Sequence, residues 1–124
     1  TLGALAVTDV PLFRESYGSQ LGQQYTAASP DLRQAHSPDE YSQVTTNALQ
    51  SLEQILESHQ DIAAVILEPL VQCAAGMHMH SPDYLRGARE LCDRHDVLLG
   101  VGQIGEREEH RDRRGDLALS RLRR

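Results

Sequence analysis

Two segments of the chain begin with the same Ser-Pro-Asp signal, continue as an amphipathic helix and end in a short apolar run. Ser37 and Ser81 are the expected N-caps, because a serine hydroxyl satisfies a free backbone N–H and the following proline suits the first helical turn. The apolar runs, residues 61–67 and 97–101, are rich in strand-forming Val, Ile and Leu. Strands that alternate with amphipathic helices indicate βαβ units with parallel strands and right-handed crossovers. We therefore predict an α/β fold class with parallel-sheet βαβ layers.

Both predicted helices present one apolar face. Glu40 stands three residues after Ser37 and completes a capping box, and the second helix runs from Pro82 to about His95. The apolar residues at helical spacing are Tyr41, Val44, Ala48, Leu52, Ile55 and Leu56 in the first helix and Leu85, Ala88, Leu91 and Cys92 in the second. On the solvent side of the second helix, opposite charges fall at i,i+4 spacing in Arg86–Glu90, Arg89–Asp93 and Glu90–Arg94.

The segment before these units is less regular. Residues 1–10 are small and apolar and fit either a helix or an inner strand, and residues 11–22 fit a short helix or turn. Residues 24–28 predict a short strand.

Composition argues against several classes of partner. A chain of 124 residues is one domain or a piece of one. Its net charge of −6 disfavours nucleic acid or an anionic membrane as the main partner. No apolar run approaches the roughly 20 residues that a membrane span needs, and no signal peptide opens the chain. Because Cys73 and Cys92 form neither a disulfide framework nor a CxxC pair, we expect a reducing, cytoplasmic setting.

Three soft ligands lie close together in the sequence between the predicted strands. Cys73, His78 and His80 could gather on one loop, but their spacing matches no zinc pattern and no fourth ligand is evident. A polar loop is the simpler interpretation, so we predict no metal site.

The last twenty residues differ in texture from the rest. The run "GEREEHRDRRGDLALSRLRR", residues 105–124, contains seven arginines and five acids, a formal charge of +2. It could be a basic interaction tail, but the interleaved acids favour a solvated, disordered end. We expect two parts: residues 1–104 as the α/β unit and 105–124 as a divergent Arg-rich tail.

Three stretches in order carry a resemblance to a known family. "TLGALAVTDVPLFRESYG", "IAAVILEPLVQCAAGM" and "YLRGARELCDRHDVLL" resemble the middle of a class III pyridoxal-phosphate-dependent aminotransferase, and Glu-Pro-Leu-Val-Gln before a small-residue loop is the most specific piece. The likeness covers residues 1–104 and is greatest to the biotin-pathway branch, which moves an amino group to 8-amino-7-oxononanoate. It implies part of the large domain of a fold-type I transferase, pyridoxal 5′-phosphate as cofactor, small-molecule amino donor and acceptor, and a homodimer.

The resemblance also implies three cofactor-binding residues. Glu68 ends an apolar strand, where an acid is either a site residue or merely the first solvated residue of a loop. The family places this acid beside the cofactor ring. It places Gln72 in the loop that follows, and Thr1 just after an aromatic motif that packs near the cofactor. Cys73 stands where the family has glycine, and a positive φ there would strain the loop.

The chain departs from the family at the residues that carry the chemistry. The family's third strand ends in an Asp-Glu pair whose aspartate keeps the pyridine nitrogen protonated, but this chain has Gly102 and Gln103 there. All twelve basic residues are arginine, so no lysine can form the Schiff base. We therefore expect no catalytic residue on this chain and an inactive, truncated segment. Two alternatives stay open: a non-catalytic interaction module, and a segment of another class III omega-aminotransferase.

Overall fold

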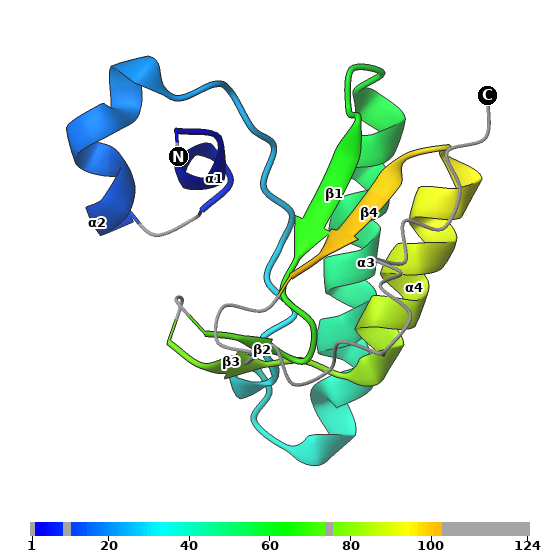
Figure 1. The fold of residues 1–124 in the computed structure, drawn as a ribbon. Helices are drawn as coiled ribbons and strands as arrows, with labels where there is room; N and C mark the ends of the chain where they lie inside the picture. The colour runs from blue at the N-terminus through cyan, green and yellow to red at the C-terminus, as the bar shows by residue number, and fades with distance from the viewer. Residues whose placement is uncertain (1, 9–10, 74–75, 103–124) are drawn as a thin grey trace, which may run out of the picture.

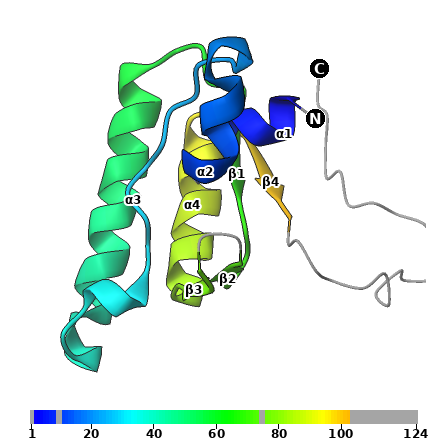
Figure 2. The ribbon, with the colours of Figure 1, turned by 90° about the vertical axis from the view of Figure 1, so that its left-hand side faces the viewer.

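A two-stranded parallel sheet backed by two helices forms the centre of the protein. The computed structural model describes residues 2–8, 11–73 and 76–102. Strands β1 (Ala64–Leu67) and β4 (Leu98–Val101) pair in parallel, with Ala64 opposite Leu98. Helices α3 (Tyr41–Ser58) and α4 (Pro82–Arg94) cover one face of this sheet (Figures 1 and 2).

The connection from β1 through α4 to β4 is right-handed, because α4 lies behind the sheet and β4 follows to the right of β1 in Figure 1. The structure confirms the predicted α/β class and its parallel strands. Both strands are shorter than predicted, beginning at Ala64 and Leu98 instead of residues 61 and 97.

The remaining elements lie around this unit. Strands β2 (Val71–Gln72) and β3 (His78–Met79) form an antiparallel hairpin just after β1. The chain opens with α1 (Leu2–Ala6) and α2 (Pro11–Arg14), which lie to one side of the sheet in Figure 1. Three 3₁₀ segments complete the order: η1 (Glu15–Gln20), η2 (Leu32–Gln34) and η3 (Pro38–Glu40). No helix in the described part of the chain is long and apolar enough to span a bilayer.

The two Ser-Pro-Asp signals behave differently. Ser81 caps α4 as predicted, and its side chain accepts a hydrogen bond from the Asp83 N–H at 3.2 Å. Ser37 makes no such bond. Instead, the Glu40 carboxylate accepts from the His36 N–H at 2.9 Å, and the 3₁₀ turn η3 precedes α3. The predicted capping box is therefore wrong in detail, because the carboxylate reaches one residue further back.

Arginines on α4 find different partners from those predicted. The Arg89–Asp93 pair forms, as expected from i,i+4 spacing. Arg86 pairs with Asp83 at i,i+3, and Arg94 reaches across to Glu53 on α3. Glu90 forms no ion pair within the described part of the chain, because both of its expected partners are engaged elsewhere. The helix spacing fixes which charges are neighbours, but tertiary contacts decide which of them pair.

Residues 24–28 are not a strand. The segment's contacts go to side chains on α3 and just after that helix. The Ala28 N–H donates to Ser51 Oγ at 3.0 Å, and the Tyr25 ring stacks on His59 with centroids 3.9 Å apart. Tyr25 therefore serves in packing against the end of α3 and not in a sheet.

The core lies between α3, α4 and one face of the sheet. Its buried members are Ala48, Leu52, Leu56, Leu67, Tyr84, Ala88 and Leu91. Gly87 allows α4 to approach α3, because a Cβ there would lie 2.5 Å from Leu49 Cδ1. The described residues leave the opposite face of the sheet bare: Ile66 and Leu98 are each 62% exposed. Parallel sheets are normally covered on both faces, so this face offers a surface for association.

We predict that the isolated chain self-associates through this bare face. Sedimentation velocity over a range of concentrations should show oligomers or aggregates. Ile66→Glu should shift the distribution toward monomer, because it places a charge at the centre of the exposed apolar surface. Glu57→Gln, an exposed change on α3, is the control and should leave the distribution unchanged. A wild-type monomer with a sharp cooperative melt would contradict the prediction.

Candidate functional site

The carboxyl ends of β1 and β4 bring Glu68 and Gly102 to the same edge of the sheet. The Gly102 N–H donates to the Leu67 carbonyl at 3.2 Å, which extends the ladder by one residue. Glu68 Oε2 accepts from the Cys73 N–H at 2.8 Å, while Oε1 is buried and has no partner among the described residues. Glu68 is therefore not simply a solvated loop residue. Its unpaired oxygen could accept a hydrogen bond from a ligand at the strand tips.

The hairpin after Glu68 carries the second candidate residue, Gln72. Its two strands contribute only two residue pairs, Val71 with Met79 and Gln72 with His78. Leu70 and Met77 adopt positive φ values of 64° and 59°. Such values are uncommon for residues other than glycine and mark a strained loop.

Strain at Cys73 is not what the structure shows. Cys73 is absent from the positive-φ residues of the described chain, which include Gly76 at 105°. Its carbonyl instead accepts from the N–H groups of Gly76 and Met77, each at 3.2 Å. The chain therefore reverses direction at residues 76–77. Cys73 does not adopt a left-handed backbone conformation, so its side chain causes no strain of that kind.

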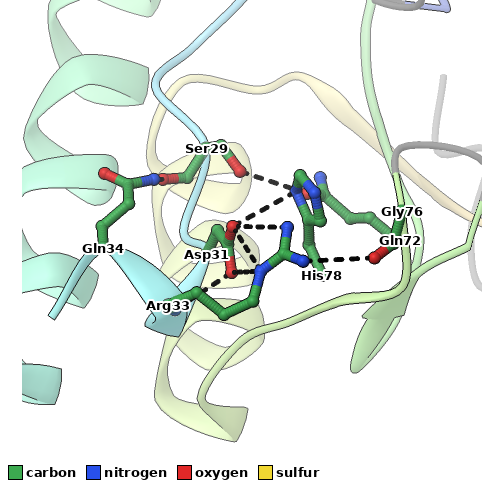
Figure 3. A network of polar contacts seen from close by, with 7 residues as sticks. All are labelled: Ser29, Asp31, Arg33, Gln34, Gln72, Gly76 and His78. Carbon is green, nitrogen blue, oxygen red and sulfur yellow. Dashed lines mark hydrogen bonds and ion pairs between the residues drawn. The ribbon is translucent and has the colours of Figure 1, made fainter.

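A polar network ties this hairpin to the segment before α3 (Figure 3). Asp31, only 7% exposed, accepts from Arg33 Nε at 3.1 Å and Nη2 at 3.0 Å. His78 Nδ1 lies 3.4 Å from the same carboxylate. Arg33 Nη1 donates to the Gly76 carbonyl at 3.4 Å, and Ser29 Oγ donates to Gln72 Oε1 at 3.2 Å. The network thus fixes the hairpin from outside.

Burial alone would raise the pKa of Asp31. Hydrogen bonds from Arg33 and the nearby charge of His78 outweigh it and hold that pKa below its ordinary value. No pattern in the sequence pointed to Asp31 or Arg33, because their partners lie more than forty residues away. The run "PDLR" places the aspartate and the arginine two residues apart. That spacing indicates a polar network only once the β2–β3 hairpin is known to lie beside it.

His80 fixes the end of the hairpin. It is 5% exposed, its Nε2 lies 3.0 Å from the Glu68 carbonyl oxygen and its Nδ1 lies 3.2 Å from that of Ser81. Its ring meets Tyr84 edge-on, with centroids 5.3 Å apart. Both ring nitrogens thus face backbone carbonyls. Among the residues that the structure describes, no three His, Cys, Asp or Glu side chains gather as a metal site requires.

The residues expected from the resemblance are only partly brought together. Glu68 and Gln72 lie at the two ends of one short segment after β1, and Gly102 lies at the tip of β4. Thr1, Gln103 and the tail from 105 lie outside the described residues. At Gly102 a Cβ would meet no atom of the described residues within 4 Å, so a side chain could be accommodated there.

The class III aminotransferase sequence model matches residues 1–104. The chain belongs to this family. It is 36% identical over 108 residues to adenosylmethionine-8-amino-7-oxononanoate aminotransferase of Aquifex aeolicus, a match that covers 84% of this chain and 23% of that enzyme. The enzyme of the same name from Geobacter sulfurreducens is 39% identical over 106 residues, with the same two coverages. The chain therefore spans about a quarter of the length of these relatives.

Solved structures support the same fold. Lysine aminotransferase from M. tuberculosis, in its internal aldimine form, superposes with a TM-score of 0.67 at 23% identity. The match covers 82% of this chain and 23% of that one. The α/β unit is thus part of a fold-type I aminotransferase fold, as the resemblance implied.

Dependence on pyridoxal phosphate is a property of this family, but the residues of this chain do not make a complete site for the cofactor. Glu68 offers a buried carboxylate oxygen that has no partner among the described residues, and a Cβ at Gly102 would meet no described atom within 4 Å. The chain contains no lysine for the covalent attachment, and the resemblance implies that Gly102 stands where an acid would face the pyridine nitrogen. The residues present therefore do not fit the cofactor as a complete site.

We predict that Asp31→Asn destabilises the protein in a pH-dependent way. A carboxyl whose folded pKa is lowered stabilises the protein above its unfolded pKa, near pH 4, and that contribution is lost as pH falls through the folded value. At pH 7 the variant should lose about 1 kcal/mol of unfolding free energy, since the arginine partner is largely exposed. Urea unfolding at several pH values measures the difference.

Below about pH 4 the wild type and Asp31→Asn should begin to converge, and the difference should vanish once pH falls below the lowered folded pKa, where the wild-type carboxyl is neutral as well. Asp93→Asn is the matched control, since it removes an exposed carboxylate on α4 that pairs with Arg89. It should cost little at any pH. An Asp31→Asn penalty that is as large at pH 3 as at pH 7 would rule out the charge-based account.

Proposed function

We propose that the chain is an internal segment of the cofactor-binding large domain of an aminotransferase that moves an amino group to 8-amino-7-oxononanoate in biotin biosynthesis. Relatives named for this reaction are 36% and 39% identical to it. The observation that carries the proposal is the Glu68 carboxylate at the carboxyl end of β1: Oε2 accepts from the Cys73 N–H, and Oε1 has no partner among the described residues. Ligands of open α/β sheets lie beyond this edge.

Glu68 and Gln72 are the residues of this chain that we assign to the wall of the cofactor pocket. Thr1 is assigned there by resemblance alone. In the complete enzyme the partners would be pyridoxal 5′-phosphate, a small-molecule amino donor and acceptor, and a second subunit. Residues 1–104 would form the domain segment and 105–124 a separate Arg-rich tail, in a cytoplasmic protein.

The chain by itself should have no transaminase activity. Bound pyridoxal phosphate supplies the electron sink for amino transfer. The chain has no lysine to bind the aldehyde covalently, and Gly102 stands in place of the acid. It can therefore neither attach the cofactor nor keep its pyridine nitrogen protonated. Enzymes lower their barriers by roughly 8 kcal/mol or more, and these two groups are central to that gain in this chemistry.

A second function has one observation in its favour. The bare face around Ile66 and Leu98 suits a non-catalytic interaction module that pairs with another polypeptide. A stable, inactive complex with an intact aminotransferase subunit would favour this second function.

The test of the proposed inactivity is chemical. The purified chain is mixed with pyridoxal phosphate and reduced with borohydride, and the adduct is mapped by mass spectrometry. We expect an adduct on the N-terminal amine alone, because no side chain carries a primary amine. Amino transfer to 8-amino-7-oxononanoate should not exceed that of free cofactor.

A chain with a blocked N-terminal amine is the control and should give no adduct. Sustained turnover above free cofactor would show that the chain is a catalyst after all.

A further inference from the structure

We propose that Ser29, Asp31 and Arg33 are positioning residues for Gln72. They form a clasp, defined as the segment 29–34, that holds the β2–β3 hairpin against the end of η2 (Figure 3). The inference rests on the proposed function, in which Gln72 lines the pocket at the strand tips. It assigns a role to a segment that neither the sequence motifs nor the family match singles out.

The hairpin needs support from outside. It has only two residue pairs, and an isolated two-stranded hairpin is marginal in water. Leu70 and Met77 add conformational strain at its entry and at its turn. A loop of this kind keeps one geometry only if surrounding contacts hold it.

The clasp meets the loop at three successive places. Ser29 Oγ donates to Gln72 Oε1 on the outgoing strand at 3.2 Å. Arg33 Nη1 donates to the Gly76 carbonyl at the turn at 3.4 Å. Asp31 Oδ2 lies 3.4 Å from His78 Nδ1 on the returning strand. Contacts at both strands and at the turn restrain the loop as a unit.

The clasp is itself ordered by internal bonds. The Asp31 side chain caps η2 by accepting from the Arg33 N–H at 3.1 Å. Gln34 Nε2 donates to the Ser29 carbonyl at 3.0 Å, which ties both ends of the segment together. Asp31 is buried, and Arg33 Nε donates to both of its carboxylate oxygens. These contacts fix the positions of the clasp donors that face the loop.

Ser29 acts directly on the side chain of Gln72. Its hydroxyl donates to Gln72 Oε1, and the amide N–H groups of Gln72 are donors that this bond does not use. Removal of one hydroxyl should therefore free the Gln72 side chain, and removal of the Asp31 charge should free the loop that carries it.

The test is hydrogen–deuterium exchange by mass spectrometry on the full chain at low concentration. Ser29→Ala, Asp31→Asn and Arg33→Gln should each speed exchange of the hairpin amides, residues 71–80, by about tenfold, and leave α3 and α4 unchanged. Ser29→Thr, which keeps the hydroxyl, should restore the wild-type rate. Arg89→Gln on the far side of α4 is the control for loss of an arginine.

A double-mutant cycle separates positioning of Gln72 from general support. If Ser29 acts through Gln72, Ser29→Ala should have little further effect in a Gln72→Ala background. Additive effects, unchanged hairpin exchange in all three variants, or equal acceleration across α3 and α4 would each overturn the proposal. None of these readouts uses the cofactor, so they can succeed even if the proposed function fails.

Discussion

Parallel pairing of β1 with β4 is the interaction on which the rest of the structure depends. It aligns Leu67 with Val101, so the chain leaves both strands at the same edge, and the Gly102–Leu67 bond closes that edge. Since α4 must cross between the two strands, it packs on the sheet and buries Leu67 and Leu91 in one core. This pairing also sets the position of Glu68, because Glu68 is the first residue after the end of β1.

The sequence predicted this central unit well for physical reasons. Both helices are marked by the periodic spacing of their apolar residues and both strands by short apolar runs, and Ser81 with its following proline marks the start of α4 correctly. Local signals failed where distant residues compete for the same groups. Glu40 bonds His36 instead of completing the box with Ser37, and Tyr25 stacks on His59 instead of joining a sheet. The clasp around Asp31 was not predictable, because its partners meet only after folding.

The candidate site, like the fold, was predictable from local sequence only in part. The apolar run of residues 61–67 placed an acid at a strand tip, but only the resemblance to class III aminotransferases gave Glu68 and Gln72 a role. The structure adds that one buried oxygen of Glu68 has no partner within the described ranges and that Ser29 donates a hydrogen bond to Gln72. Fold and chemistry are separable in this chain: the segment keeps the family's α/β fold, whereas its sequence contains no lysine.

The most direct test of this account measures the activity of a chimera of the Aquifex aeolicus relative. In this chimera, residues 2–102 of the present chain replace the matching segment, Asp replaces Gly102, and the enzyme's own sequence follows. If the segment keeps the geometry of the cofactor wall, this chimera should transfer amino groups to 8-amino-7-oxononanoate. The version that retains Gly102 should lose activity by several orders of magnitude, and Glu68→Ala in the active version should lower it again. A soluble, folded chimera that is inactive even with the restored aspartate would contradict the account.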